Sequence, residues 1–266
     1  MKYEVFDILG SAKLYSYLPE NSHLDEKDPR RVRPAVIVLP GGGYAVTSDR
    51  EAEPIALQFL SEGISVFVLR YSVMAKFPLS LCEVAESIRL VRSHAEEWSI
   101  DPNRIAVCGF SAGGHLTGSI AVFWNHEFLA QKLGVSSEEI KPNGAILCYP
   151  VLSEDYMHEG SFRNLLFDDY EAMKSFVSIE KQVTEQTPPC FLWHTFTDAA
   201  VPVENSLVMA KALADHKVPF ELHIWPDGPH GLALVTPETN FAGMENGYCA
   251  RAASWIHSAA NWLREI

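Results

Sequence analysis

The stretch Cys108-Gly109-Phe110-Ser111-Ala112-Gly113-Gly114-His115 decides how the rest of the chain is interpreted. It follows a short, β-branched apolar run at 104–108, which predicts a buried strand, and it precedes residues 116–123, whose apolar side chains recur at helical spacing. A G-x-S-x-G pattern between a strand and a helix predicts a nucleophile elbow, a tight turn that exposes the serine hydroxyl. Side chains in place of Gly109 and Gly113 would collide with neighbouring backbone. The bare pattern also fits a small-residue turn with a surface serine, so its context must carry the prediction.

Length and composition indicate one large α/β domain covering residues 1–266. The chain is 47% hydrophobic, and its mean hydropathy is near zero, which is typical of a well-packed soluble protein. The first seven residues include the acids Glu4 and Asp7 where a signal peptide would have its apolar core, and no apolar run reaches transmembrane length. The five cysteines show no C-x-x-C or metal-like spacing. We therefore expect a cytoplasmic protein.

The net charge of −13 argues against nucleic acid and anionic membranes as partners. It places no restriction on a neutral small-molecule substrate. The sequence leaves the oligomeric state open.

Strands and helices alternate along most of the chain. Strand patterns, mostly continuous apolar runs, occur at 34–39, 64–69, 144–149, 191–195 and 220–225. Amphipathic helical patterns separate or follow them at 51–62, 79–98, 203–216 and 246–263. This alternation predicts a mostly parallel central sheet with helices on both faces. Residues 11–18 alternate loosely and predict an edge strand, and the charged segment 19–33 predicts a surface loop.

Residues 151–189 interrupt this rhythm. They are mixed in character and show little regular period. The segment is too long for an ordinary loop. We expect a small lid or cap inserted over the ends of the strands.

Catalytic residues in such sheets lie beyond the carboxyl ends of the strands. Ser111 occupies that position in the predicted elbow, Asp198 follows the strand at 191–195, and His230 follows the strand at 220–225. A serine hydroxyl needs an imidazole to take its proton and a carboxylate to fix the imidazole tautomer. The order Ser…Asp…His is the one seen in α/β-hydrolases.

Other histidines compete for the role of base. His230 lies in a Gly/Pro-rich loop from which a ring can reach the serine. His115 is one helical turn past the serine and is expected to point away from it. His194 lies inside a strand, and His223 and His257 fit a strand and a helix, so all three are interpreted as structural. We therefore favour His230.

Two other acids compete with Asp198. Asp227 is three residues from His230, and Asp-Gly is a turn-forming dipeptide. Glu204 lies near the start of a predicted helix, where it suits the macrodipole. Asp198 has the better position in the predicted sheet.

The loop after the strand at 34–39 carries Gly41, Gly42 and Gly43 in succession. Without side chains, this backbone can turn its N–H groups into a cavity. Such groups would form the second half of an oxyanion hole.

The chain resembles the α/β-hydrolase esterases, specifically the bacterial carbohydrate-esterase-like branch near the acetyl-xylan and feruloyl esterases. The resemblance runs from about Pro34 to the C-terminus. The motifs that carry it are Leu39-Pro40-Gly41-Gly42-Gly43-Tyr44, Ser48-x-Arg50-Glu51-x-Glu53-Pro54, Gly109-Phe110-Ser111-Ala112-Gly113-Gly114-His115, Thr187-Pro188-Pro189, Asp198-x-x-Val201-Pro202 and His230-Gly231. It implies the α/β-hydrolase fold.

By this resemblance Ser111 is the nucleophile, His230 the base and Asp198 the acid. The oxyanion donors would be the backbone N–H of Ala112 and one N–H from Gly42 or Gly43. The implied activity is hydrolysis of short-chain carboxylic esters, with acetyl or related acyl groups on sugars or oligosaccharides as expected substrates. It needs no metal and no organic cofactor.

The resemblance has one departure. Esterases similar to hormone-sensitive lipase carry His-Gly-Gly-Gly, whereas Pro40 precedes the glycines here. This points away from that branch but leaves a backbone oxyanion hole intact. The serine at position 111 also excludes the cysteine nucleophile of dienelactone hydrolases.

Substrate contacts are expected from two aromatic residues beside the motifs. Phe110 adjoins the nucleophile and Tyr44 adjoins the glycine loop, so their rings could stack on a sugar or close on a short acyl group; packing is the alternative. Arg50, Glu51 and Glu53 could bind a polar substrate. We favour instead a structural ion pair that ties the oxyanion loop to the following helix.

Two other functions remain open at this point. The same triad would serve an amide hydrolase of the arylformamidase or prolyl-peptidase-like kind, although this chain has no room for the gating domain of an oligopeptidase. A catalytically inactive hydrolase fold could act as a binding module. The presence of all three triad residues argues against that last possibility.

Overall fold

We describe the fold from a computed structural model. It describes residues 1–20, 32–156, 159–240 and 249–266. No helix in these ranges is both long and apolar enough to cross a lipid bilayer.

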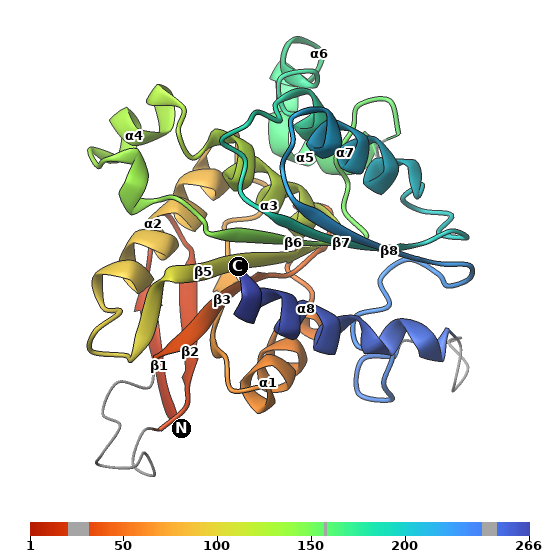
Figure 1. Cartoon of the computed structure of the whole chain (residues 1–266). Coiled ribbons are helices and arrows are strands. Elements are labelled where there is room, and N and C mark those ends of the chain that lie inside the picture. Colours follow the sequence, from red (N-terminus) through yellow and green to blue (C-terminus); the bar gives the residue numbers. More distant parts are fainter. Residues whose placement is uncertain (21–31, 157–158, 241–248) are drawn as a thin grey trace.

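An eight-stranded sheet forms the centre of the described structure, in the spatial order β1-β2-β4-β3-β5-β6-β7-β8 (Figure 1). The strands are β1 (Lys2–Asp7), β2 (Lys13–Leu18), β3 (Arg33–Leu39), β4 (Ser65–Arg70), β5 (Ile100–Phe110), β6 (Gly144–Cys148), β7 (Cys190–Thr195) and β8 (Phe220–Trp225). The pairs β1–β2 and β2–β4 are antiparallel, and all later pairs are parallel. The predicted α/β architecture is therefore confirmed.

Helices cover both faces of this sheet (Figure 1). Their bounds are α1 (Glu53–Ser61), α2 (Leu79–Ser93), α3 (Ala112–Phe123), α4 (Glu127–Leu133), α5 (Glu159–Leu166), α6 (Tyr170–Met173), α7 (Glu204–Asp215) and α8 (Trp255–Glu265). Helices α1 and α8 pack on one face, and α2, α3 and α7 pack on the other. Two hydrophobic cores result, one on each side of the sheet.

Strand β3 shows why the apolar runs fold this way. Its side chains are buried along its whole length. Ala35, Ile37 and Leu39 pack into the core under α2 and α3, whereas Val36 and Val38 pack into the core under α1 and α8. Successive side chains of a strand point to opposite faces, so a strand covered on both sides is apolar at successive positions, as residues 34–39 are.

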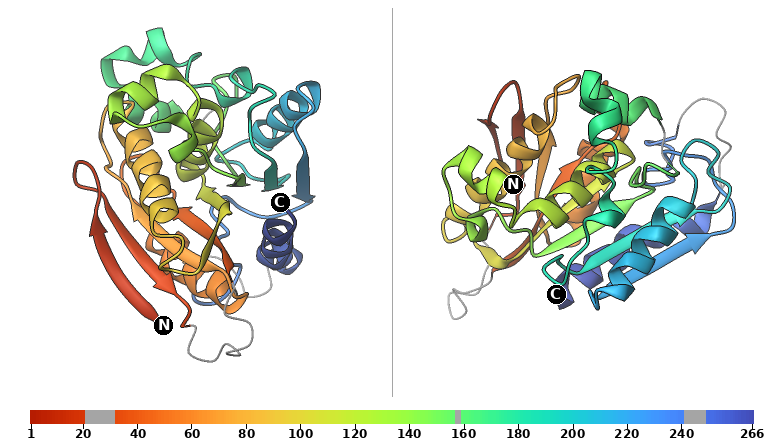
Figure 2. Two further views of the ribbon diagram at one scale, coloured as in Figure 1. Left: turned by 60° about the vertical axis from the view of Figure 1, so that its left-hand side comes forward. Right: turned by 90° about the horizontal axis from the view of Figure 1, so that it is seen from above.

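The strand expected at 11–18 is present as β2, but the expectation that it lies at the edge of the sheet is wrong. Strand β2 lies between β1 and β4, and β1 forms the edge (Figure 2). The sequence pattern did not predict β1 at Lys2–Asp7, because only one face of an edge hairpin is covered. The apolar residues Tyr3 and Val5 are exposed there, whereas Glu4 is half-buried, so polarity does not follow burial along β1.

Two predicted helices are shorter than expected. The pattern at 79–98 gives a helix that ends at Ser93. The closing helix α8 begins at Trp255, after a 3-10 turn at Ala250–Ser254, and residues 246–248 of its predicted span lie outside the described residues. Most of the loop predicted at 19–33 also lies outside them, and β3 already begins at Arg33.

The segment 151–189 contains short helical pieces instead of a continuous element. Helices α5 and α6 are joined and followed by 3-10 turns at Phe167–Asp169 and Ile179–Lys181. It lies on the α3 side of the sheet, near α7 (Figure 1). Its role as a lid stays a prediction.

Candidate active site

The turn between β5 and α3 has a strained backbone at its centre. Ser111 adopts φ 54° and ψ −116° between the end of the strand and the first helical residue. A residue with a side chain pays about 1–3 kcal/mol for such dihedrals. The flanking glycines permit the close packing around it: a Cβ on Gly109 would lie 2.0 Å from the Gly113 carbonyl oxygen, and one on Gly113 would lie 2.1 Å from the Leu39 carbonyl oxygen.

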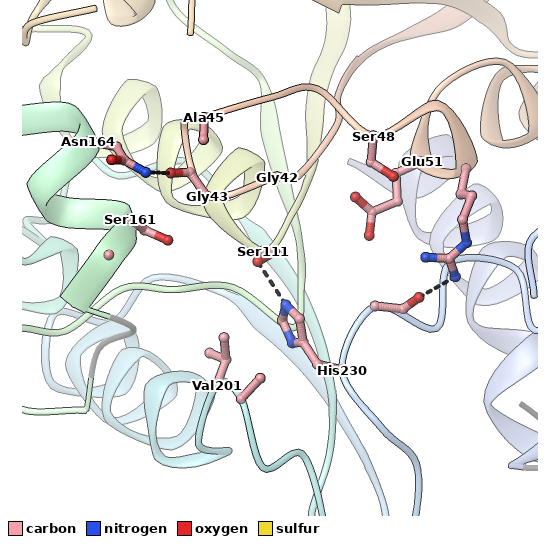
Figure 3. Close-up of a pocket in the computed structure, with 14 residues that line it drawn as sticks. Gly42, Gly43, Ala45, Ser48, Glu51, Ser111, Ser161, Asn164, Val201 and His230 are labelled. Carbon is pink, nitrogen blue, oxygen red and sulfur yellow. Dashed lines mark hydrogen bonds between the residues drawn. The ribbon is translucent and has the colours of Figure 1, made fainter. Parts of the chain in front are cut away.

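Three residues from the ends of three strands form one hydrogen-bonded chain. The Oγ atom of Ser111 lies 2.8 Å from Nε2 of His230 (Figure 3). On the other side of the ring, Nδ1 of His230 lies 2.7 Å from Oδ2 of Asp198. The parallel strands β5, β7 and β8 bring the three together because their carboxyl ends meet at one edge of the sheet.

Asp198 is held as a carboxylate. Its side chain is fully buried, and its Oδ1 atom accepts the backbone N–H groups of Ala200 and Val201 at 3.0 and 2.9 Å. Burial alone would raise its pKa, but hydrogen bonds from His194 and His230, with the charge of His230, hold the pKa of Asp198 well below its usual range. The group can therefore orient the imidazole and stabilise its charged form.

The other candidate acids lie elsewhere. Asp227 is exposed in the loop that follows β8, and Glu204 occupies the first turn of α7. No hydrogen bond joins either carboxylate to His230 in the described part of the chain.

His115 is buried on α3 with both ring nitrogens engaged. Its Nδ1 atom lies 2.7 Å from the Tyr44 hydroxyl, and its Nε2 atom lies 2.8 Å from the Val177 carbonyl oxygen. Burial lowers its pKa to about 4. This neutral ring packs between the loop after β3 and the segment 151–189, away from Ser111.

The remaining rival histidines also have other partners. His194 contacts the Ser206 hydroxyl at 2.9 Å and lies behind Asp198, with its Nε2 atom 3.4 Å from Oδ2. His223 bonds to its strand neighbour Glu221, and His257 bonds to Glu62 on the surface.

The loop after β3 places free backbone donors beside Ser111. Gly42 and Gly43 have φ values of 128° and 64°, which favour glycine, and both line the same cavity as Ser111. Within the described residues, no protein acceptor takes the N–H groups of Gly42, Gly43 or Ala112. The carbonyl oxygen of Gly43 is held by the side-chain amide of Asn164 on α5, at 2.8 Å (Figure 3).

Tyr44 and Phe110 do not line the cavity, so the expectation that they contact substrate is not met. The Tyr44 side chain is buried, and its hydroxyl is hydrogen-bonded to Nδ1 of His115. Phe110 is the last residue of β5 and faces the core under α8, where its ring packs against Trp255 at a centroid distance of 5.7 Å. Packing, the alternative for both residues, accounts for their positions.

The cavity at Ser111 has a volume of about 490 Å³. Its lining residues are Gly42, Gly43, Ala45, Ser48, Arg50, Glu51, Ser111, Gly160, Ser161, Asn164, Ala200, Val201, His230 and Gly231. In Figure 3, Ser161 and Asn164 lie on one side of Ser111, and Ser48 and Glu51 lie on the other.

Sequence reasoning missed several of these residues. Ser48 and Val201 belong to motifs that carry the family resemblance, so those motifs could have indicated that both residues lie at the site. Ser161 and Asn164 come from the segment 151–189, where no motif or period marks them.

Among the described residues, hydrogen bonds join Glu51 and Arg50 to the loops of the site, and the favoured ion pair between Arg50 and Glu51 or Glu53 is not formed. The Glu51 carboxylate is buried and accepts the N–H of Gly41 at 2.8 Å. Arg50 donates to the carbonyl oxygen of Gly231, next to His230, at 2.7 Å. Glu53 begins α1 and is exposed.

Comparison with known proteins gives a consistent set of relatives. The family model BD-FAE matches residues 22–213. The chain is 36% identical over 246 residues to endo-1,4-beta-xylanase B of Butyrivibrio fibrisolvens, and 30% identical over 236 residues to an acetylxylan esterase of Xylanibacter ruminicola. These matches cover 88% and 85% of this chain but only 37% and 45% of those proteins. The chain therefore spans less than half the length of these curated relatives.

Solved structures match over nearly the whole chain. The acetyl ester-xyloside bifunctional hydrolase from Caldicellulosiruptor lactoaceticus superposes with a TM-score of 0.80 at 38% identity, covering 98% of this chain and 90% of that one. The carboxylesterase Cest-2923 from Lactobacillus plantarum superposes with a TM-score of 0.87 at 26% identity, covering 99% and 96%.

Proposed function

The chain belongs to the BD-FAE family and has the α/β-hydrolase fold, and from this premise we propose that it is a serine esterase. Its proposed substrates are short-chain carboxylic esters, in particular acetyl or related acyl groups on sugars or oligosaccharides. The observation that carries the proposal is the continuous hydrogen-bonded chain from Ser111 through His230 to Asp198. This arrangement is the one that activates a serine hydroxyl for attack on a carbonyl carbon.

In the first half of the proposed reaction, Oγ of Ser111 attacks the ester carbonyl while Nε2 of His230 takes its proton. Asp198 keeps the ring in the required tautomer and stabilises the imidazolium that forms. The carbonyl oxygen becomes negatively charged and accepts hydrogen bonds from the N–H of Ala112 and one N–H from Gly42 or Gly43. Loss of a single such donor typically costs about 2.7–4 kcal/mol of transition-state stabilisation.

Collapse of this intermediate breaks the ester C–O bond. The imidazolium of His230 gives its proton to the departing alkoxide oxygen, and the alcohol leaves an acyl group on Ser111. Water then attacks the acyl carbonyl as His230 takes one of its protons. Returning that proton to Oγ releases the carboxylic acid and restores the enzyme.

The cavity supports a small substrate with a polar alcohol. Its volume of about 490 Å³ lies in the range of pockets that bind small ligands. Ser48, Arg50, Ser161 and Asn164 bring hydroxyl, guanidinium and amide groups to its wall. Such groups suit the hydroxyls of a sugar, and the similar proteins include an acetylxylan esterase and an acetyl ester-xyloside bifunctional hydrolase.

A side-by-side assay tests this proposal. Acetylated xylo-oligosaccharides and p-nitrophenyl acetate should turn over faster than N-formylkynurenine or a dipeptide amide. Faster turnover of either amide than of any ester would contradict the esterase assignment.

Labelling with a fluorophosphonate tests the nucleophile separately. The probe should attach to the wild-type protein at Ser111 and should leave Ser111→Ala unlabelled. A folded wild-type protein that stays unlabelled would instead support a binding module.

A further inference from the structure

The buried carboxylate of Glu51 lies between two loops. One is the loop after β3 that carries Gly41, Gly42 and Gly43, called the oxyanion loop, and the other is the loop after β8 that carries His230, called the histidine loop or His230 loop. Glu51 ends the 3-10 turn Asp49–Glu51, and only 4% of the residue is exposed. Its Oε2 atom accepts the N–H of Gly41 at 2.8 Å. Its Oε1 atom accepts the hydroxyl of Tyr149 at 2.7 Å. The proposed catalytic steps use neither oxygen, so this group is unexplained by the triad alone.

Tyr149 extends this connection to the loop that carries the base. It follows β6 and is buried. Its hydroxyl oxygen accepts the backbone N–H of Ala233 at 3.0 Å. Its ring also packs edge-on against His230, with the centroids 5.1 Å apart and the planes at 72°. One tyrosine therefore contacts both the catalytic ring and the backbone three residues beyond it.

The directions of these hydrogen bonds fit an ionised carboxylate. Ala233 donates to Tyr149, Tyr149 donates to Glu51, and Gly41 donates to the other oxygen of Glu51. An ionised carboxylate only accepts, so every position in the chain is satisfied. Burial, together with the charge of Glu51, raises the pKa of Tyr149 well above its ordinary value, which keeps its hydroxyl available as a donor.

Arg50 holds the same histidine loop from the neighbouring position in the turn. Its guanidinium donates to the carbonyl oxygens of Gly231 and Thr239 at 2.7 and 2.5 Å. Arg50 thus binds two carbonyl oxygens of the loop directly. Its neighbour Glu51 is connected to the N–H of Ala233 through Tyr149.

The opposite end of the connection lies directly beside the nucleophile. A Cβ placed on Gly41 would be 2.7 Å from Oε2 of Glu51 and 3.0 Å from Cβ of Ser111. The Glu51 carboxylate, the Gly41 backbone and Ser111 are therefore packed without spare room. Any shift of Gly41 would carry Gly42 and Gly43 with it and displace their N–H groups.

We propose that Glu51 is a positioning residue that fixes the oxyanion loop and the His230 loop relative to each other through Tyr149. The catalytic consequence rests on the proposed function, because it supposes that both loops act on Ser111. A misplacement of about 1 Å in such a site can cost about 100-fold in rate. The function of the Arg50-Glu51 motif is then alignment of the two loops.

Glu51→Gln tests the proposal against a matched control, Glu83→Gln. Glu83 is likewise a buried carboxylate that accepts one backbone N–H and one hydroxyl, both from Ser72, but it lies on α2 outside the cavity. Glu51→Gln should lower kcat on p-nitrophenyl acetate by about 10- to 100-fold, with KM changed by less than about 3-fold. Glu83→Gln should retain nearly the wild-type kcat even if it is equally destabilised.

Tyr149→Phe provides a second variant, because it removes only the hydroxyl and keeps the ring against His230. We expect a loss in kcat of about 10-fold. Since Glu51 and Tyr149 act in one connection, the double variant should lose far less than the product of the two single losses. A loss of kcat in the double variant equal to the product of the two single losses would overturn the proposal.

Hydrogen exchange measures the connection without relying on activity. In Glu51→Gln, backbone amides at 39–46 and 231–235 should exchange faster than in the wild type, and in Glu83→Gln they should not. Unchanged exchange at 231–235 in both Glu51→Gln and Tyr149→Phe would overturn the proposal. If the wild type hydrolyses no ester, and Glu51→Gln still speeds exchange at both segments, the proposed function is contradicted but the link between the two loops stands.

Discussion

His230 and Asp198 are joined by a hydrogen bond of 2.7 Å between Nδ1 and Oδ2, although 32 residues separate them in the chain. The carboxylate is buried, whereas about a quarter of the imidazole surface is exposed. The acid is therefore fixed by the protein, and the base faces the cavity in which a substrate would bind.

Asp198→Asn should lower kcat by about 10⁴-fold while leaving the protein folded. An asparagine amide facing Nδ1 would favour the wrong imidazole tautomer for taking a proton from Ser111. Steady-state kinetics beside Asp227→Asn, an exposed acid near the same histidine, gives the comparison. Near-normal activity in Asp198→Asn together with a large loss in Asp227→Asn would reverse the assignment of the acid.

Ser111→Gly should be more stable than Ser111→Ala by about 1 kcal/mol, although both should lose turnover. Alanine keeps the side-chain strain of φ 54°, worth about 1–3 kcal/mol, and glycine relieves it at an entropic cost of about 0.5–1 kcal/mol. Urea denaturation of the two variants measures the difference. Equal stabilities would mean that the elbow stores no backbone strain.

Gly109→Ala should destabilise the fold by about 3 kcal/mol or more. Its Cβ would lie 2.0 Å from the Gly113 carbonyl oxygen, and backbone cannot move aside as a flexible side chain can. Gly134→Ala is the control for the added methyl group, because no atom lies within 4 Å of its Cβ, although Gly134, unlike Gly109, has a positive φ of 69°. That variant should lose only about 1–2 kcal/mol, the cost of the left-handed conformation. Comparable losses in the two variants, measured by denaturation, would argue against a steric origin.

His115 should make the protein less stable as the pH falls. Burial lowers its folded-state pKa to about 4, below the ordinary value of 6.5, so the unfolded chain binds a proton between these values and the folded chain does not. Stability is therefore complete above about pH 6.5 and is lost progressively down to pH 4, by about 3 kcal/mol in total.

His115→Asn lacks this titration and isolates it from the other groups. The free energy of unfolding of the wild type minus that of the variant should shrink by about 3 kcal/mol from pH 7 to pH 4. Urea denaturation at several pH values provides the measurement. A difference that stays constant with pH would show that His115 does not titrate in this window.

Local patterns were sufficient for much of the fold. The runs that became β3 to β7 are apolar because both of their faces are covered, so they stand out in the sequence without knowledge of their neighbours. The edge strand β1 was missed for the opposite reason, since it is only partly covered. The positions of Ser111, Asp198 and His230 follow from the strands that precede them.

Tyr44 and Phe110 were expected to contact substrate because each adjoins a site residue in the sequence, but neither lines the cavity. Each adjoins a predicted site residue, but backbone direction decides which way a side chain points. The geometry at the end of β5 sends Phe110 into the core under α8, and the turn of the oxyanion loop sends Tyr44 to His115. Adjacency along a chain does not specify a side of the sheet.

The sequence by itself determined the α/β architecture, the strand–turn–helix at Ser111 and the order of the residues proposed for the triad, because each depends on short-range chemistry and on chain order. Only the tertiary structure decided which distant groups meet around Ser111. Asn164 reaches Gly43 from another segment, and Glu51 reaches Ala233 through Tyr149. Such contacts depend on how separate loops pack over the end of the sheet, and no local pattern records that packing.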